Sequence, residues 1–476
     1  MIQALILMHR WLSIPLGPLF VLWFATGIVM HYVPFPAQTE SDRFAALPVL
    51  DIAVSLRSPA EALAAGGIDH PARIRLFQRV DGPVYVISAA GLSAAIHADT
   101  LAAADMNDPG LALSVARAAA QQRGLEADRA AIAALDSYDQ WTVPNRFDVH
   151  RPLHRIALHD PDGTELYVSS KTGEVVLDTT RFERAWNYVG SVVHWIYPTV
   201  LRKDWAAWNI VVWWLSLAAV IAAVTGALLG PMRLRPREAQ LCSRYRGWHL
   251  WHHWAGLLCM QFVLTWMVSG WLSMDHGRLF ATGHLTPSEE AILVGTPDWS
   301  RLTAVALAAV HGEVREIEWF AFGGRLHQRT RRAPGQQQIS VLDGASARII
   351  GRFLQPADVN AATSRLGHDC ARSTEVEPGE DYPFVSDVPG APVHRVICGD
   401  TWYHVDAASG AVLEKLDPSR RAYRWLYQAL HTLDFPALLA HAALRTVLIV
   451  GLCAIGLVFS ITGVVIGWRR LRMKLR

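Results

Sequence analysis

The stretch that decides the fold is HRWLSIPLGPLFVLWFATG, residues 9–27. It returns 243 positions later as HHWAGLLCMQFVLTWMVSG, residues 252–270, and the two align without a gap, so that His9 matches His252. Each stretch is apolar between its ends and finishes on a hydroxyl residue followed by glycine. Because a helix of about 20 apolar residues crosses a bilayer, we expect a transmembrane helix in both places.

A second set of residues recurs 237 positions later and again includes a histidine. His194 and the pair Thr225-Gly226 return as His431 and Thr462-Gly463. The other members are Thr172-Gly173, Arg184, Gly230 and Arg233, which return as Ser409-Gly410, Arg421, Gly467 and Arg470. The pattern predicts an internal tandem duplication in which each half runs helix, long polar domain, helix. Since the repeat carries residues that bind metals, we expect a two-fold site rather than scattered histidines.

The composition also favours a membrane protein. Of the 476 residues, 51% are hydrophobic and 18% are charged, which lies outside the usual soluble range. Four apolar runs, at about 11–32, 208–229, 254–274 and 444–468, approach or exceed the length of a span. The first is longer than a signal-peptide core and no clear cleavage pattern follows it, so we interpret it as an uncleaved anchor.

The predicted fold class is a membrane bundle of four transmembrane helices with two exported α+β domains. The predicted segments are transmembrane helices at 1–33, 206–232, 249–275 and 441–468, exported α+β domains at 34–205 and 276–440, a cytoplasmic loop at 233–248 and a basic cytoplasmic tail at 469–476.

Arginines near the spans predict the orientation, because positively charged loops stay in the cytoplasm. The loop at 233–248 contains five arginines, and the tail at 469–476 is rich in them. Both termini are therefore expected in the cytoplasm and both large domains in the periplasm, across a bacterial inner membrane. The net charge of +2 gives no case for nucleic acid, and anionic lipid accounts for the basic residues near the spans.

The cysteines exclude several redox centres. Cys370 and Cys398 are the two cysteines in the expected exported domains, and they are candidates for one disulfide. The chain has no Cys-x-x-Cys and no Cys-x-x-Cys-His. A redox dithiol, the common iron–sulfur clusters and covalently attached haem are therefore disfavoured.

Each exported domain ends in an alternating apolar pattern broken by a turn, which predicts a hairpin. The hairpins are expected at 166–176 and 402–413, where Gly173 and Gly410 supply the positive φ of a tight turn. A strand precedes each hairpin, at 152–156 and 392–396. Looser strand patterns around 74–96 and 317–350, with an Ala-rich helix at 111–122, complete the α+β prediction.

The hairpin Tyr403-His404-Val405-Asp406, followed by Ser409-Gly410 and Val412, resembles the PepSY domain. Its place between spans that begin His-Arg-Trp or His-His-Trp resembles the PepSY-associated transmembrane proteins, also called iron-regulated membrane proteins, over essentially the whole chain. The resemblance implies similarity to haem-containing siderophore reductases of the inner membrane, which release iron from ferric siderophores in the periplasm. Many other members of the family have no assigned activity.

Non-covalent haem needs axial imidazoles presented at matching depth from facing helices. His9 with His252, and His194 with His431, satisfy this condition through the repeat. His253 is an alternative to His252, and the sequence does not decide which of them faces inward. One or two b-type haems are expected. If there are two, one lies at each membrane face.

Two further histidines, His31 and His441, depart from the repeat and are alternative or additional ligands on the exported side. A histidine at a helix end is often only an interfacial side chain, but recurrence at equal depth favours a ligand role. Arg445 is a candidate partner for a haem propionate, although snorkelling explains it equally well.

An oxidoreductase needs an electron donor, and the chain has no Gly-x-Gly-x-x-Gly motif and only a short cytoplasmic loop, so no flavin or NAD site is expected. Quinol or an electron-donor protein would supply electrons to a ferric-siderophore-like substrate. Two alternatives remain: a cofactor-free anchored module that binds peptides or a periplasmic partner, and a metal-binding accessory factor. Residues with a weaker case for lining a substrate cleft are His154-Arg155, His394-Arg395 and Tyr138–Trp141.

Overall fold

The computed structural model describes residues 2–52, 55–89, 91–237, 240–303, 312–343, 346–367, 369–377, 379–382 and 384–474. The chain divides into two compact units. The helical unit comprises Met1–Phe35, Glu183–Thr282 and Ser419–Arg476, and the sheet unit comprises Pro36–Phe182 and Gly283–Pro418.

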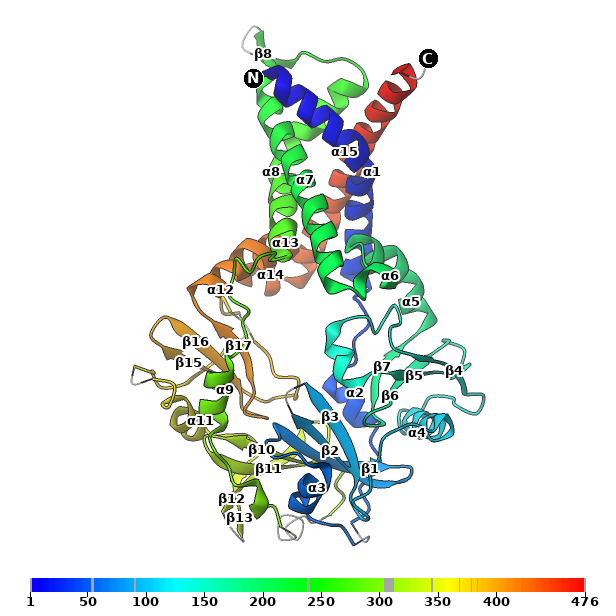
Figure 1. Ribbon diagram of the computed structural model, residues 1–476. Coiled ribbons are helices and arrows are strands. Elements are labelled where there is room, and N and C mark those ends of the chain that lie inside the picture. Colours follow the sequence, from blue (N-terminus) through cyan, green and yellow to red (C-terminus); the bar gives the residue numbers. More distant parts are fainter. Residues whose placement is uncertain are drawn as a thin grey trace. The chain divides into compact units, whose positions relative to one another are not determined.

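Within the described residues, four helices are long and apolar enough to cross a membrane. They are α1 (Ile2–Tyr32), α7 (Trp205–Met232), α8 (Trp248–Ser273) and α15 (Ala442–Lys474). The four helices form a bundle in which α1 and α8 each pack against both α7 and α15 (Figure 1). The four predicted spans are therefore confirmed as helices. The largest difference is in α15, which continues through the arginines assigned from sequence to a separate tail.

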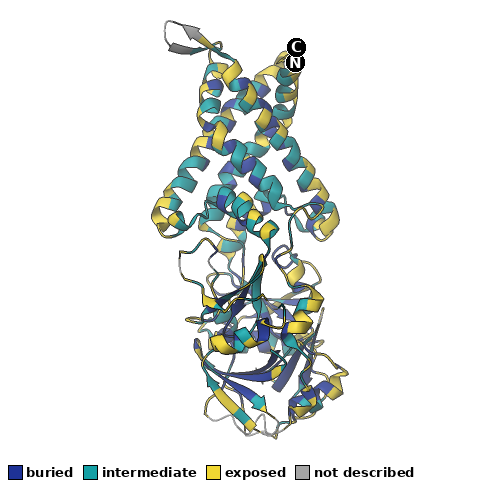
Figure 2. Ribbon diagram, turned by 90° about the vertical axis from the view of Figure 1, so that its left-hand side faces the viewer, coloured by how far each residue is buried: buried dark blue, intermediate teal, exposed yellow. Residues whose placement is uncertain are grey.

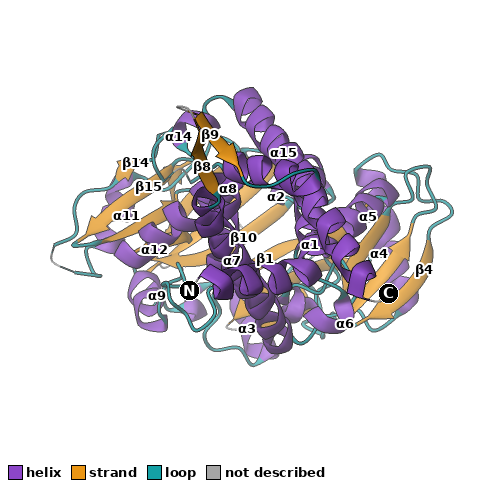
Figure 3. Cartoon of the chain, turned by 90° about the horizontal axis from the view of Figure 1, so that it is seen from above, coloured by secondary structure: helices purple, strands orange, loops and turns teal. Residues whose placement is uncertain are grey.

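Short elements connect the long helices. They are α5 (Arg181–Asn187), η2 (Tyr188–Val192), α6 (Thr199–Arg202), α12 (Pro418–Tyr423), η4 (Arg424–Ala429), α13 (Leu430–Thr432) and α14 (Pro436–Leu439). Between α7 and α8, strands β8 (Leu234–Arg237) and β9 (Gln240–Ser243) form a small antiparallel hairpin. Coloured by secondary structure, the helical unit is otherwise helix and loop (Figure 3).

The sheet unit contains three antiparallel sheets in the described residues. The seven-stranded sheet has the order β13-β12-β11-β10-β1-β2-β3. Its strands are β1 (Arg73–Arg79), β2 (Gly82–Ala89), β3 (Leu92–His97), β10 (Glu316–Phe322), β11 (Arg325–Ala333), β12 (Gln336–Asp343) and β13 (Ser346–Gly351).

The other two sheets have four strands each and the same order. One is β4 (Ala131–Asp136), β5 (Leu153–Ala157), β6 (Glu165–Ser169) and β7 (Val175–Thr179). The other is β14 (Thr374–Glu375), β15 (Val393–Cys398), β16 (Thr401–Asp406) and β17 (Val412–Leu416). Both predicted hairpins and the strand before each are thus confirmed. The register of β6–β7 shifts after Tyr167, and that of β16–β17 shifts after His404, 237 positions later.

Strands β1 and β10 join the two halves of the sheet unit. They pair antiparallel, with Arg75 opposite Glu318 and Leu76 opposite Ile317. Leu76 and Ile317 are fully buried in one core cluster that draws residues from both halves, and the strands of this sheet are largely buried (Figure 2). The two segments that the sequence suggests as separate domains therefore share a sheet and a hydrophobic core.

Helices and a disulfide complete the sheet unit. The helices are α2 (Glu40–Ala45), α3 (Pro59–Gly66), α4 (Pro109–Gln122), η1 (Asn145–His150), α9 (Pro287–Val294), η3 (Trp299–Arg301) and α11 (Pro356–Thr363). α3 and α9 begin at capping boxes, in which Ser58 and Glu61, or Thr286 and Glu289, satisfy each other's free backbone N–H groups. Cys370 is bonded to Cys398.

Candidate functional site

Four histidines of the helical unit are held in the same way. His9 lies on α1, His252 on α8, His194 shortly after η2, and His431 on α13 directly after η4. In each case the ring nitrogen Nδ1 contacts a threonine or serine hydroxyl on a neighbouring helix, and the next residue of that helix is glycine. The helix thus offers the ring a polar atom and a surface without a side chain.

The first pair is His9 and His252. Thr462 Oγ1 on α15 lies 2.9 Å from His252 Nδ1. Thr225 Oγ1 on α7 lies 3.4 Å from His9 Nδ1, which is also 3.0 Å from the carbonyl oxygen of Ala222.

The second pair is His194 and His431. Thr26 Oγ1 on α1 lies 2.9 Å from His194 Nδ1, and Ser269 Oγ on α8 lies 3.1 Å from His431 Nδ1. The Trp23 indole N–H donates to the backbone carbonyl of His194 at 2.9 Å. The two ring centres are 6.4 Å apart and the ring planes are inclined by 70°. The sequence repeat made His194 and His431 candidates for one pair, and the structure brings their rings together.

The glycines beside the hydroxyls are in close contact with the histidine rings. A Cβ atom at Gly226 would lie 2.8 Å from His9 Cε1, closer than real Cβ contacts. At Gly270 the corresponding distance to His431 Cε1 is 3.1 Å. In the structure, Gly226 therefore makes room for an imidazole.

The four histidines fit axial ligation of a metal. A ligating histidine almost always uses its other ring nitrogen for a hydrogen bond that fixes the tautomer and the orientation of the ring. Here Nδ1 has that role, and the described parts of the chain provide no hydrogen bond to Nε2 of any of the four. A metal–nitrogen distance of about 2 Å places two imidazole centres roughly 6 Å apart across one ion. The spacing of 6.4 Å between His194 and His431 agrees with this value.

Two π-helices lead into the second pair. η2 precedes His194, and η4 precedes His431 at matching positions of the two halves. π-helical turns are rare and occur frequently at functional sites, because the wider turn redirects the side chains that follow it. Sequence reasoning missed them, since helical periodicity does not reveal one extra residue in a turn.

His253 does not face the first pair. Its Nδ1 lies 2.6 Å from Ser243 Oγ on β9, and its Nε2 lies 2.8 Å from the carbonyl oxygen of Gly230 on α7. Both ring nitrogens therefore have hydrogen-bond partners within the protein, and the side chain links β9 to α7. Of the two adjacent histidines, His252 is the one that the structure places at the pair.

His31 and His441 also lie apart from the pairs. His31 Nε2 lies 2.9 Å from Thr446 Oγ1 on α15. His441 is exposed, and its Nδ1 lies 2.9 Å from the carbonyl oxygen of Ala437, one turn earlier. Arg445, the candidate propionate partner, donates from Nη2 to the carbonyl oxygen of Thr432 at 2.8 Å. Neither histidine has the hydroxyl–glycine surface that the paired histidines share.

The bundle between the two pairs is apolar. Its hydrophobic core is formed by Phe24, Ala219, Cys259, Val263, Trp266, Met267 and Cys453. Ser216 of α7 and Ser460 of α15 are also buried. His9 and Thr26, which mark the two ends of this region on α1, are 17 positions apart, or about 25 Å along a helix. A region of this kind excludes water from the space between the two pairs.

The weaker sequence candidates in the sheet unit have structural partners. His154 is buried and its Nε2 lies 2.7 Å from the carbonyl oxygen of Met106. Arg155 pairs with Asp136 at 3.2 Å, and Arg395 donates from Nε to His404 Nε2 at 3.0 Å. Among the residues described, no three or more His, Cys, Asp or Glu side chains are grouped as in a bare metal-ion site.

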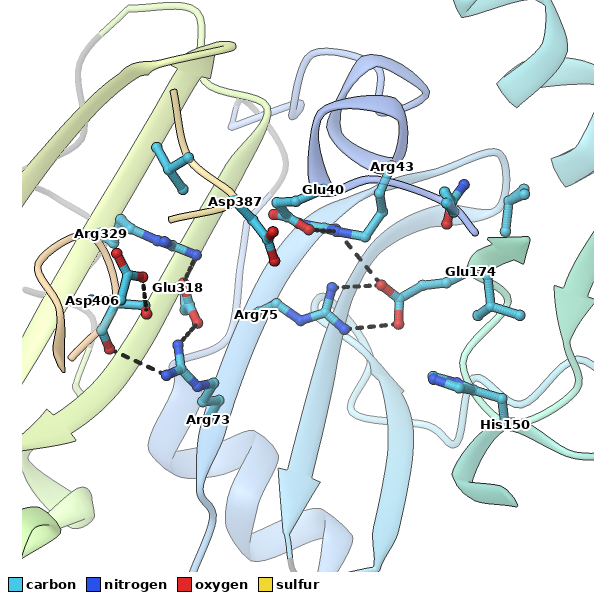
Figure 4. A pocket seen from close by; sticks show the side chains of 15 residues that line it. Glu40, Arg43, Arg73, Arg75, His150, Glu174, Glu318, Arg329, Asp387 and Asp406 are labelled. Carbon is cyan, nitrogen blue, oxygen red and sulfur yellow. Dashed lines mark hydrogen bonds and ion pairs between the residues drawn. The ribbon is translucent and has the colours of Figure 1, made fainter. Parts of the chain in front are cut away.

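The sheet unit also contains a polar cavity that sequence reasoning missed. It measures about 390 Å³ and lies at the β1–β10 junction (Figure 4). The charged residues that line it are Glu40, Arg43, Arg73, Arg75, Glu174, Glu318, Arg329, Asp387 and Asp406. They come from both halves of the unit, and sequence periodicity gives no signal of such a meeting.

A buried carboxylate, Glu316, interacts with Arg43 and Arg75, two of the arginines that line this cavity. Glu316 accepts from Arg43 and Arg331, each at 2.8 Å, and Arg75 lies 3.6 Å away. Burial acts to raise the pKa of Glu316, but the nearby guanidinium groups outweigh it and hold this pKa well below its usual range. Burial also acts to raise the pKa of Glu40. Arg43 and Arg331 outweigh burial and lower this pKa to about 2.

The long apolar helices and the paired histidines define a multi-pass membrane protein with a repeated histidine site. The sequence matches the family described as PepSY-associated TM region over residues 6–470. The chain belongs to this family, as its motifs suggested. No curated protein and no solved structure matches the chain.

Proposed function

We propose that this protein is a b-type haem oxidoreductase of the bacterial inner membrane that relays electrons to a ferric-siderophore-like substrate on the periplasmic side. The observation that carries the proposal is the fourfold repetition of one arrangement, in which a histidine Nδ1 meets a hydroxyl and the ring lies against a glycine. Simple interfacial histidines do not require this arrangement.

His9 with His252, and His194 with His431, would each hold one haem. A haem with two imidazole ligands supplies one-electron transfer at its iron. The chain's own hydroxyls orient the four rings, keep the proton on Nδ1 and leave Nε2 for the metal. The apolar core between the pairs excludes water.

The electron donor and the acceptor lie outside the chain. Quinol in the bilayer or an electron-donor protein would reduce the site at one end of the bundle, because the chain has no nucleotide-binding motif. The resemblance of the chain's motifs to the haem-containing siderophore reductases supports an iron(III) chelate of the siderophore type as the acceptor.

Absorption spectroscopy of the purified full-length protein, before and after dithionite, tests the proposal. We expect a reducible b-type spectrum that loses the contribution of one site in His252→Ala. His253→Ala is the matched control, because the adjacent histidine has both nitrogens occupied by the protein, and we expect it to keep the full spectrum. A colourless wild-type protein would overturn the proposal and favour a cofactor-free membrane-anchored binding module. Reduction of a ferric siderophore by the pre-reduced protein tests the acceptor.

A further inference from the structure

The cavity of the sheet unit has two walls of opposite charge. The wall from the first half carries Arg43, Arg73 and Arg75 against Glu40 and Glu174, and the wall from the second half carries Glu318, Asp387 and Asp406 against Arg329. Among these described residues, the first wall has an excess of one positive charge and the second an excess of two negative charges. Figure 4 shows Arg43, Arg75 and Glu174 on one side of the cavity and Glu318, Arg329 and Asp406 on the other. Arg73 of β1 lies beside Glu318, with which it pairs at 2.6 Å.

The first wall also has buried polar atoms without hydrogen-bond partners. Gln38 Nε2 and His150 Nδ1 are both buried, and within the described structure neither has a partner. Both residues line the cavity. Burial is the main cause that lowers the pKa of His150, so its ring is neutral at pH 7 and one nitrogen carries a proton. Because buried polar groups are nearly always satisfied, two such atoms at one cavity indicate a missing hydrogen-bond partner, which for the Gln38 N–H is an acceptor.

The second wall offers a carboxylate that no described residue engages. Asp387 is exposed at the rim and its side chain points into the cavity (Figure 4). Asp406 differs, because its carboxylate accepts from the backbone N–H of Ala408 at 3.1 Å and from the Ser409 hydroxyl. Asp387 is therefore the acidic group available to a cationic ligand.

We propose that this cavity binds a small zwitterion of amino-acid to dipeptide size. The carboxylate of the ligand accepts from Gln38 and His150, and its ammonium group pairs with Asp387. The volume of about 390 Å³ is at the lower end of the range for small-molecule sites. A simple anion would face the excess negative charge of the second wall, and a simple cation would leave the donors of the first wall unsatisfied.

Isothermal titration calorimetry on the full-length protein in detergent tests the proposal with three probes. Alanyl-alanine carries both charges, N-acetyl-alanyl-alanine lacks the ammonium group, and alanyl-alaninamide lacks the carboxylate. We expect the uncapped dipeptide to bind and each capped analogue to bind at least about 10-fold more weakly, the effect of losing one charge-assisted hydrogen bond. Absence of dipeptide binding, or equal binding of all three probes, would overturn the proposal.

Two variants assign the contacts. Asp387→Asn should abolish the preference for the dipeptide over its acetylated form, and Gln38→Leu should reduce the preference over the amide. Asp343→Asn changes an exposed aspartate at the end of β12 that does not line the cavity, and should retain both preferences. If Asp387→Asn retains them as well, the proposed orientation of the ligand is wrong. The outcome is independent of haem, because the cavity and the paired histidines belong to different units.

Discussion

At the scale of the residue, the glycine that follows each hydroxyl decides whether an imidazole can lie against the helix. Gly226→Ala places a methyl group 2.8 Å from His9 Cε1, an overpacking that costs about 1–3 kcal/mol. We expect this variant to lower the thermal unfolding midpoint and to reduce haem content at the His9–His252 site. The control is Gly451→Ala on α15, whose added methyl group meets nothing within 4 Å. Equal behaviour of the two variants would mean that His9 is not held against Gly226.

The sequence offered candidate histidine pairs but did not decide among the alternatives or show how the rings are held. The repeat alone matched His9 with His252 and His194 with His431, because a duplication preserves depth in the bundle. It left His252 and His253 undecided, since the choice depends on Ser243, which the hairpin brings beside His253. The hydroxyl–glycine pairs were a usable signal: one ends each of the repeated stretches 9–27 and 252–270, and others recur at 225–226 and 462–463.

At the scale of the element, the pairing of β1 with β10 could not be predicted. Each strand has a strand-like sequence pattern and pairs with the strand that follows it in sequence, β1 with β2 and β10 with β11. Sequence patterns therefore gave no reason to expect that β1 also pairs with β10. Arg75 and Glu318, which lie opposite each other in this pair, are separated by a whole transmembrane hairpin in sequence. Charged residues of the two strands, among them Arg75 and Glu318, then meet at the cavity, and their interactions depend on the pairing of β1 with β10.

A substitution of Glu316 on β10 tests how much the buried charges stabilise the pairing of β1 with β10. Glu316→Gln leaves Arg43, Arg75 and Arg331 with less negative charge in a buried place, which costs about 3–5 kcal/mol near pH 7. A carboxylate with a depressed pKa stabilises the fold fully above its unfolded pKa, near 4.5, and loses that contribution as the pH falls towards its folded pKa.

The difference in unfolding midpoint between wild type and Glu316→Gln should therefore be constant at neutral pH and shrink below about pH 4.5. Thermal unfolding of the full-length protein from pH 7 to pH 3 measures it. Glu313→Gln removes an exposed carboxylate nearby and should change the midpoint little at any pH. A loss in Glu316→Gln that is independent of pH would show that side-chain packing, rather than charge, holds the junction.

At the scale of the whole molecule, disulfide-bonded and free cysteines lie in different units. The bonded pair, Cys370 and Cys398, belongs to the sheet unit, whereas the free Cys242, Cys259 and Cys453 belong to the helical unit. Disulfides persist in oxidising compartments. Arginines also gather in the segment between α7 and α8 and at the end of α15, which is the pattern of cytoplasmic segments. These two independent features agree with a periplasmic sheet unit.

A membrane-impermeant maleimide applied to spheroplasts tests this orientation. Cys242, which follows the arginine-rich strand β8, should remain unlabelled until the inner membrane is lysed. Ile349→Cys, at a position that is 61% exposed on β13, should be labelled in intact spheroplasts. Labelling of Cys242 before lysis, with Ile349→Cys protected, would reverse the orientation. A sheet unit in the cytoplasm could not receive a chelate from the periplasm, so the result decides whether the proposed acceptor has access to the protein.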